Sequence, residues 1–144
     1  MIKIEYPLYQ PKIKMVDNKE LIFDNLRKQW ILLTPEEWVR QNFLQYLIQI
    51  KNYPSSLIAI EKTIQLNGLK KRFDIVVYNK LLQPWMVIEC KEMGVSLNQN
   101  VLDQVIRYNM VLQAAYMVIT NGTSCYCYGT SNNQILVMTE LPEF

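Results

Sequence analysis

Residues 72–91, which decide the fold, read Arg72-Phe-Asp-Ile-Val-Val-Tyr-Asn-Lys-Leu-Leu-Gln-Pro-Trp-Met-Val-Ile-Glu-Cys-Lys91. The apolar runs Arg72–Tyr78 and Trp85–Cys90 predict two buried strands. Asp74 lies inside the first strand, and Glu89 and Lys91 lie at the end of the second. Charged side chains in such strands are costly to bury unless they are paired or hold a metal ion.

The alternation of side chains along a strand puts Glu89 and Lys91 on the same side. If the two strands pair as a hairpin, Asp74 joins them and forms one acidic site flanked by a lysine. Carboxylates on adjacent strands can hold Mg²⁺, which supports phosphodiester hydrolysis, while a lysine orients water or phosphate. A simple ion pair between strands explains the same residues equally well, so both interpretations stay open.

The composition of the chain excludes several kinds of catalytic site. The chain has 144 residues, 50% of them hydrophobic, and a net charge of +2, which does not by itself predict a nucleic-acid partner. The absence of histidine excludes His-based triads and most zinc enzymes, which leaves carboxylates to hold any metal. Three cysteines are too few for a disulfide scaffold and indicate a reducing, cytoplasmic location. No apolar run is long enough for a membrane partner to be expected.

The chain is predicted to be a single domain, 1–144, because no linker or repeat interrupts it. Residues 1–33 form an N-terminal extension, and residues 34–144 form the core. Lys12–Phe23 alternates around Asp17-Asn18 and predicts a β-hairpin in that extension.

The clearest helix start in the core lies at residues 34–37. Thr34 is the predicted N-cap, Pro35 suits the first helical position, and Glu37 completes a capping box. Apolar residues at helical spacing carry this helix to about Lys51. Glu36 is expected to complement the helix dipole as a first-turn acid.

The rest of the core predicts an α/β fold with a mixed β-sheet flanked by α-helices. The strand Leu57–Leu66 and the two strands of residues 72–91 form an antiparallel meander, with a tight turn at Asn67-Gly68. A helix capped by Asn98 or Asn100 then leads to a strand that returns parallel, at Ala115–Thr120. Two edge strands are expected to follow it, at Thr123–Tyr128 and Gln134–Leu141.

Several blocks, in order, resemble one family: the N-terminal nuclease domain of the restriction (motor) subunit of type I restriction enzymes, within the PD-(D/E)xK nuclease superfamily. The resemblance covers roughly residues 12–130, and the proline that names the superfamily is replaced by Phe73 before Asp74. The blocks are Ile22–Trp30, Leu33–Gln41, Lys71–Val77, Ile88–Lys91 and Ile119–Gly122. The resemblance implies a restriction-endonuclease-like fold.

The resemblance also implies roles for individual residues. Asp74 and Glu89 would be metal ligands, and Lys91 would position the attacking water or the phosphate. Glu37 matches an acid of the first helix that can complete the metal site, although its capping role explains it equally well. The expected ion is Mg²⁺, with Mn²⁺ as the alternative.

Two further groups are candidates for contact with the substrate. Gln104 and Tyr108 match a Q-x-x-x-Y motif on one helix face, where they would contact the DNA backbone or support the active-site lysine; helix packing is the competing explanation for Tyr108. The basic run Lys70, Lys71 and Arg72 precedes Asp74 and would bind DNA phosphates, unless it is only a solvated turn.

Taken together, these features predict a Mg²⁺-dependent deoxyribonuclease, most simply an endonuclease, that acts on double-stranded DNA. A non-catalytic DNA-binding or assembly module with the same fold is the alternative, and an RNA nuclease is a third. The chain contains no phosphate-binding Gly-x-x-x-x-Gly-Lys motif. A separate translocase or restriction–modification subunit is therefore an expected partner. A homodimer is also expected, because two-strand cleavage needs two sites.

Overall fold

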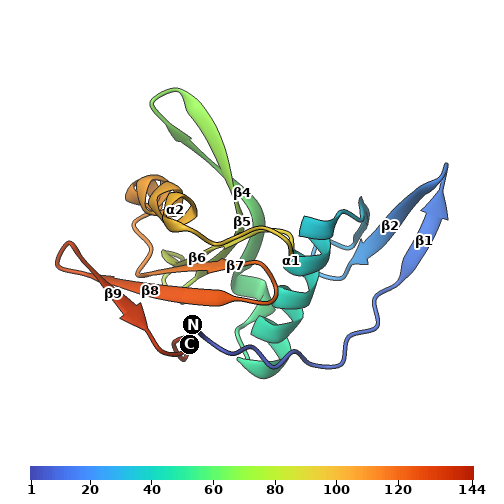
Figure 1. The fold of residues 1–144 in the computed structure, drawn as a ribbon, viewed down its shortest axis with the longest axis horizontal. Coiled ribbons are helices and arrows are strands. Elements are labelled where there is room, and N and C mark those ends of the chain that lie inside the picture. The colour runs from blue at the N-terminus through green and yellow to red at the C-terminus, as the bar shows by residue number, and fades with distance from the viewer.

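A six-stranded mixed sheet forms the centre of the protein in a computed structural model that describes residues 1–144 (Figure 1). Neighbouring strands pair antiparallel, except for β6 and β7, which are parallel and joined through α2 (Gln99–Leu112). The strands follow their chain order: β4 (Ile58–Leu66), β5 (Leu69–Tyr78), β6 (Pro84–Cys90), β7 (Tyr116–Thr120), β8 (Cys125–Ser131) and β9 (Gln134–Met138). The predicted meander and parallel return are confirmed.

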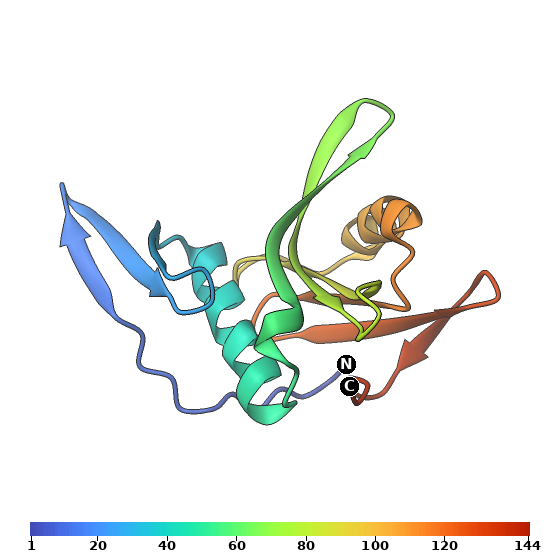
Figure 2. The same ribbon diagram turned by 180° about the vertical axis from the view of Figure 1, so that it is seen from behind.

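The two long helices cover opposite faces of this sheet, as Figures 1 and 2 show. On one face α1 (Pro35–Gln45), which a π-helical turn (Tyr46–Ile50) continues, packs through Phe43 and Leu47 against Ile75 and Ile88. On the other face α2 packs through Val105 in a second apolar cluster, with Phe73, Val76 and Val87. A short 3₁₀ turn (Ser55–Leu57) leads from the first helix into β4. None of the helices combines the length and the apolar character that a bilayer crossing requires.

The N-terminal extension forms a three-stranded antiparallel sheet instead of a simple hairpin. The predicted hairpin is present as β1 (Ile13–Val16) and β2 (Lys19–Asp24), with Asp17 and Asn18 at positive φ. A third strand, β3 (Gln29–Leu32), pairs with β2, and the sequence did not predict it. The residues before β1 extend across the core, where Ile2 is buried and its N–H donates to the carbonyl of Cys125 at 2.8 Å.

Two predictions about strands are wrong in detail. The segment predicted as an edge strand at Thr123–Tyr128 is β8, which pairs with both β7 and β9, so of the two predicted edge strands β9 alone lies at an edge. Its cysteines, Cys125 and Cys127, are buried because the strand is internal to the sheet. Strand β6 begins at Pro84, one residue before the predicted start at Trp85. A proline is compatible with the first residue of a strand.

The side-chain alternation of β5 is broken at Asp74. Phe73 and Val76 pack toward α2, whereas Ile75 packs toward α1, so two successive residues, Asp74 and Ile75, face the same side. Opposite this point Glu61 of β4 has a φ of 57°, which is unusual for a residue other than glycine. The outer half of the β4–β5 hairpin is thereby turned away from the sheet and projects beyond it (Figure 1).

The two chain termini lie side by side at the end of the molecule away from this hairpin (Figures 1 and 2). The last residues are held by the segment that follows α1: the Tyr53 hydroxyl donates to the carbonyl of Pro142 at 2.6 Å, and Lys51 pairs with Glu143 at 2.6 Å.

Candidate active site

The predicted acids meet where the pairing of β5 with β6 ends. The last paired residues are Ile75 and Ile88, and beyond them the hairpin turns away. The amide of Cys90 donates instead to Asp74 Oδ2, at 2.8 Å, so a side chain replaces the next backbone partner. Asp74 and Glu89 both line a cavity of about 610 Å³ that opens between β3 and the β4–β5 hairpin.

The Asp74 carboxyl is held in an environment that disfavours its charge. Burial, and then the negative charge of Glu89, raise its pKa to about 7, and the charge of Glu36 adds to the effect. The N–H of Cys90 and the Arg40 guanidinium act in the opposite direction. Two acids are thus kept close together in a site that favours an added positive charge.

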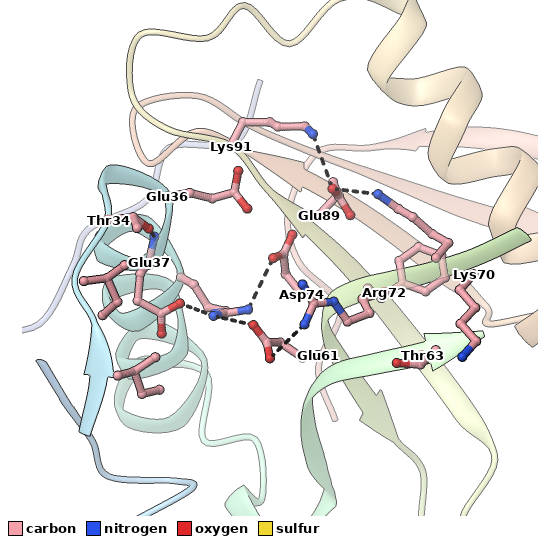
Figure 3. A pocket seen from close by; sticks show the side chains of 15 residues that line it. Thr34, Glu36, Glu37, Glu61, Thr63, Lys70, Arg72, Asp74, Glu89 and Lys91 are labelled. Carbon is pink, nitrogen blue, oxygen red and sulfur yellow. Dashed lines mark hydrogen bonds and ion pairs between the residues drawn. The ribbon is translucent and has the colours of Figure 1, made fainter. Parts of the chain in front are cut away.

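The carboxylate of Glu89 is engaged through one oxygen only. Lys91 Nζ lies 3.4 Å and Lys71 Nζ lies 3.3 Å from Oε1 (Figure 3). Oε2 is buried and has no hydrogen-bond partner. A buried carboxylate oxygen without a partner is uncommon, because its desolvation is left uncompensated.

Arg40 and Arg27 connect the acids behind the cavity, and neither was predicted to be part of the site. Arg40 is buried and pairs with Glu37 Oε2, with Asp74 Oδ1 at 3.4 Å and with Glu61 Oε1 at 3.1 Å. Arg27 pairs with Glu37 at 3.3 Å and with Glu61 at 3.3 Å. Arg40 thus places a positive charge between Glu37 and Asp74.

The start of α1 explains why Glu37 points into this network. Thr34 caps the helix as predicted, accepting the N–H of Glu37 at 3.0 Å. The Glu37 carboxylate does not return to the cap. It accepts from Gln41, at 2.9 Å, and pairs with Arg40; these two residues lie within reach because they are four and three residues further along the helix. It also pairs with Arg27, which precedes the helix.

The structure brings Asp74 and Glu89 to one cavity, while the carboxylate of Glu37, the third predicted ligand, pairs with Arg27 and Arg40. No group of three or more Cys, Asp or Glu side chains lies close enough to hold a metal ion. Glu36 and Glu37 of the first helix both line the cavity, and Glu36 is the one directed toward Asp74 and Glu89 (Figure 3). Its neighbour Glu37 faces the arginines instead.

The two groups of residues predicted to contact the substrate lie in different places relative to the cavity. Lys70, Lys71 and Arg72 all line the cavity, but Lys71 is engaged with Glu89 while Lys70 is exposed. Tyr108 does not line the cavity; its ring lies 5.7 Å from Lys71 Nζ. Gln104 is exposed on α2, one turn earlier, and is not part of the cavity wall.

The donor set nevertheless fits a divalent cation. Mg²⁺ is commonly held by one or two protein carboxylates, with water and substrate phosphate completing its shell. Asp74 and Glu89 supply two such groups, and the free Oε2 of Glu89 supplies an unused acceptor. Sequence reasoning located these two acids, assigned Glu36 only to the helix dipole, and did not identify Arg40.

The mixed sheet with a helix on each face and two acids at an open strand junction defines a restriction-endonuclease-like fold. The family model described as type I restriction enzyme R protein N terminus (HSDR_N) matches residues 35–142. The chain therefore belongs to this family.

A solved structure agrees with this fold. A fragment of a protein assigned as the HsdR subunit of a type I restriction enzyme from Vibrio vulnificus YJ016 aligns with a TM-score of 0.58 and 16% identity, over 77% of this chain and 24% of that one. The chain thus spans about a quarter of that relative. The DrdV–DNA complex aligns with a TM-score of 0.43 and 20% identity, over 72% of this chain and 10% of that one. The curated proteins include no match to the chain.

Proposed function

We propose that the protein is a Mg²⁺-dependent DNA nuclease domain of a restriction–modification system, acting in the cytoplasm. The observation that carries the proposal is the pair Asp74 and Glu89, which share an open cavity while Glu89 Oε2 remains buried without a partner. The match to a family of restriction-enzyme subunits supports phosphodiester hydrolysis as the reaction of this site. Mn²⁺ is expected to substitute, since it accepts the same oxygen ligands.

Asp74 and Glu89 would hold the cation, and the nearby negative charge of Glu36, which also raises the pKa of Asp74, would add to its attraction. The bound ion supplies positive charge for the scissile phosphate and for the attacking water. Lys91, fixed against Glu89 at 3.4 Å, would orient the water or receive the phosphate charge. Arg40 pairs with Asp74 Oδ1 and the N–H of Cys90 donates to Oδ2, so these two contacts would fix the orientation of the carboxylate beside the ion.

The DNA would lie along the projecting β4–β5 hairpin. On its cavity side this hairpin carries Thr63, Lys70 and Arg72 (Figure 3). The two cations can neutralise phosphates next to the acids without contacting base edges. Binding is therefore expected to depend on salt and to show little sequence preference.

Cleavage of DNA is the first test of this proposal. Wild-type protein is expected to cut plasmid and linear DNA only with Mg²⁺ or Mn²⁺. Glu89→Gln and Lys91→Met are expected to lower the rate by at least about 100-fold, the size of a typical acid–base or charge contribution. Lys80→Met, an exposed lysine in the turn before β6, serves as the matched control and should cut normally.

The alternatives give distinct results in the same assay. A folded protein that binds DNA but shows no metal-dependent cutting would be the non-catalytic module. Preferential cutting of RNA would identify a ribonuclease. If an added translocase or restriction–modification subunit is required, cleavage will appear only when that partner is present. If the protein must dimerise on DNA, the cleavage rate will rise with the square of protein concentration.

Glu36 and Glu37 provide a matched pair on one helical turn. Glu36→Gln is expected to raise the Mg²⁺ concentration needed for half-maximal stabilisation severalfold and to change the unfolding free energy by less than about 0.5 kcal/mol. Glu37→Gln is expected to cost about 3 kcal/mol, because it breaks a buried ion network. Thermal and urea unfolding at several Mg²⁺ concentrations measure both quantities. A raised Mg²⁺ requirement in Glu37→Gln alone, with stability retained, would restore Glu37 as the ligand.

A further inference from the structure

Two adjacent lysines of β5 have different surroundings. Lys70 is exposed at the cavity rim, whereas the Lys71 side chain is 19% exposed and lies against Glu89 and Tyr108. Successive strand residues face opposite sides, and the broken alternation at Asp74 turns Lys71 with Phe73 toward α2. The basic run before Asp74 therefore contains residues of two kinds.

The position of Lys71 is determined by contacts on two sides. Its Nζ lies 3.3 Å from Glu89 Oε1, the same oxygen that Lys91 approaches to 3.4 Å. The Tyr108 ring, 5.7 Å from the same Nζ, provides a cation–π contact from α2. Tyr108 itself packs among the apolar residues of α2 and the sheet, so its ring is a fixed surface for the ammonium group.

The charges around the acids balance without an added ion. When all of them are ionised, five acids and five cations line the cavity: Glu36, Glu37, Glu61, Asp74 and Glu89 against Arg40, Lys70, Lys71, Arg72 and Lys91. A divalent cation that enters between Asp74 and Glu89 must therefore overcome the repulsion of a lysine already paired with Glu89.

We propose that Lys71, held by Tyr108, is the internal counter-ion of Glu89 and sets the Mg²⁺ concentration that the site requires. This inference rests on the proposed function, because it concerns the same metal site. Lys71 is thereby a positioning residue that acts through Glu89, and Lys70 and Arg72 are left as the phosphate contacts of the basic run. The Tyr of the Q-x-x-x-Y motif supports Lys71 in this arrangement.

The test compares Lys71→Met with Lys70→Met by titrating Mg²⁺ in the absence of DNA at pH 8.5, with calorimetry and thermal stability as readouts. Lys71→Met is expected to bind Mg²⁺ about tenfold more tightly, because a positive charge a few ångströms from the ion is removed. The metal-free protein should become less stable, since Glu89 loses a partner. Lys71→Arg should bind Mg²⁺ like the wild type, because the charge is retained.

Lys70→Met should leave Mg²⁺ binding unchanged. It should instead weaken DNA binding and lower the salt slope by about one unit, as loss of one phosphate contact does. Tyr108→Leu should shift Mg²⁺ binding in the direction of Lys71→Met by a smaller factor, and Tyr108→Phe should not, because the ring remains.

Two results would overturn the inference. One is unchanged or weaker Mg²⁺ binding in Lys71→Met together with a DNA-binding loss that matches Lys70→Met; Lys71 would then be a phosphate contact. The other is no Mg²⁺ binding by wild type or variant, which would remove the metal site as well. Mg²⁺ binding with the expected shift but without DNA cleavage would overturn the nuclease function alone.

Discussion

Arg40→Met is expected to destabilise the protein by about 3–5 kcal/mol, the cost of breaking a buried ion pair and leaving its partner charges uncompensated. Arg40 is 6% exposed and is the one side chain that pairs with Glu37, Glu61 and Asp74 together. Burial alone would lower its pKa, but Glu37, Asp74 and Glu61 together outweigh that effect and raise the pKa. Urea unfolding measures the loss directly.

The control and a double variant separate this explanation from a loss of packing. Arg107→Met removes an exposed arginine of α2 and should change stability by less than about 0.5 kcal/mol. Adding Asp74→Asn to Arg40→Met removes one of the charges left behind, so the double variant should recover part of the loss. A cost below about 1 kcal/mol for Arg40→Met would contradict the assignment of a buried network.

Asp74→Asn is expected to abolish metal-dependent cleavage, by about 1,000-fold or more, because a cation contribution of several kcal/mol is lost and each 1.36 kcal/mol is a factor of ten. The same change should stabilise the metal-free protein at pH 8. The pKa of Asp74 is about 7 in the folded chain, against 3.8 as the ordinary value. Opposite effects on activity and metal-free stability are the signature expected of a residue kept for function.

The pH dependence follows from the direction of this shift. The unfolded chain releases the Asp74 proton near pH 4, while the folded chain keeps it until about pH 7. Stability attributable to this group is therefore complete at low pH, is lost as pH rises from about 4 to 7, and stays low above that range. The gain from Asp74→Asn should be largest at pH 8, up to roughly 4 kcal/mol, and should disappear near pH 4.

Mg²⁺ should reverse this comparison. A ligand that binds only the folded state stabilises it, so the wild type should gain stability with Mg²⁺ at pH 8 and Asp74→Asn should gain little. Thermal unfolding of the wild type and of Asp74→Asn at pH 4, 6 and 8, with and without Mg²⁺, measures each of these stabilities. An Asp74→Asn variant that is less stable than wild type at pH 8 without metal would contradict the raised pKa.

The strands and helices that hold Asp74, Glu89 and Lys91 could be predicted because their signals are local. Apolar periodicity marked β5 and β6, Thr34 marked the start of α1, and Asn67-Gly68 marked the hairpin turn. Asn98 similarly marked the start of α2. In each case the residues that decide the structure are neighbours in the sequence.

The remainder of the site depends on contacts between distant segments. Whether Glu36 or Glu37 faces the acids is decided by the rotation of α1 against the sheet, which Phe43 and Leu47 set by packing. Nothing near Arg40 in sequence indicates that Glu61 and Asp74 will surround it.

The broken alternation at Asp74 had no local signal either. Glu61, opposite this point, has a positive φ although it is not a glycine, and Lys71 rather than Lys70 reaches Glu89. Strict alternation counted back from Ile75 would place Lys71 on the side of α1, whereas in the structure Lys71 lies with Phe73 on the side of α2 and contacts Glu89.

The adjacent termini bear on how the domain can be attached to other proteins. Both ends emerge at the side of the molecule remote from the β4–β5 hairpin (Figures 1 and 2). A fusion partner or surface tether joined at either end would therefore leave the opening of the cavity accessible to double-stranded DNA. Immobilised protein should accordingly keep its access to DNA, whichever terminus is used for attachment.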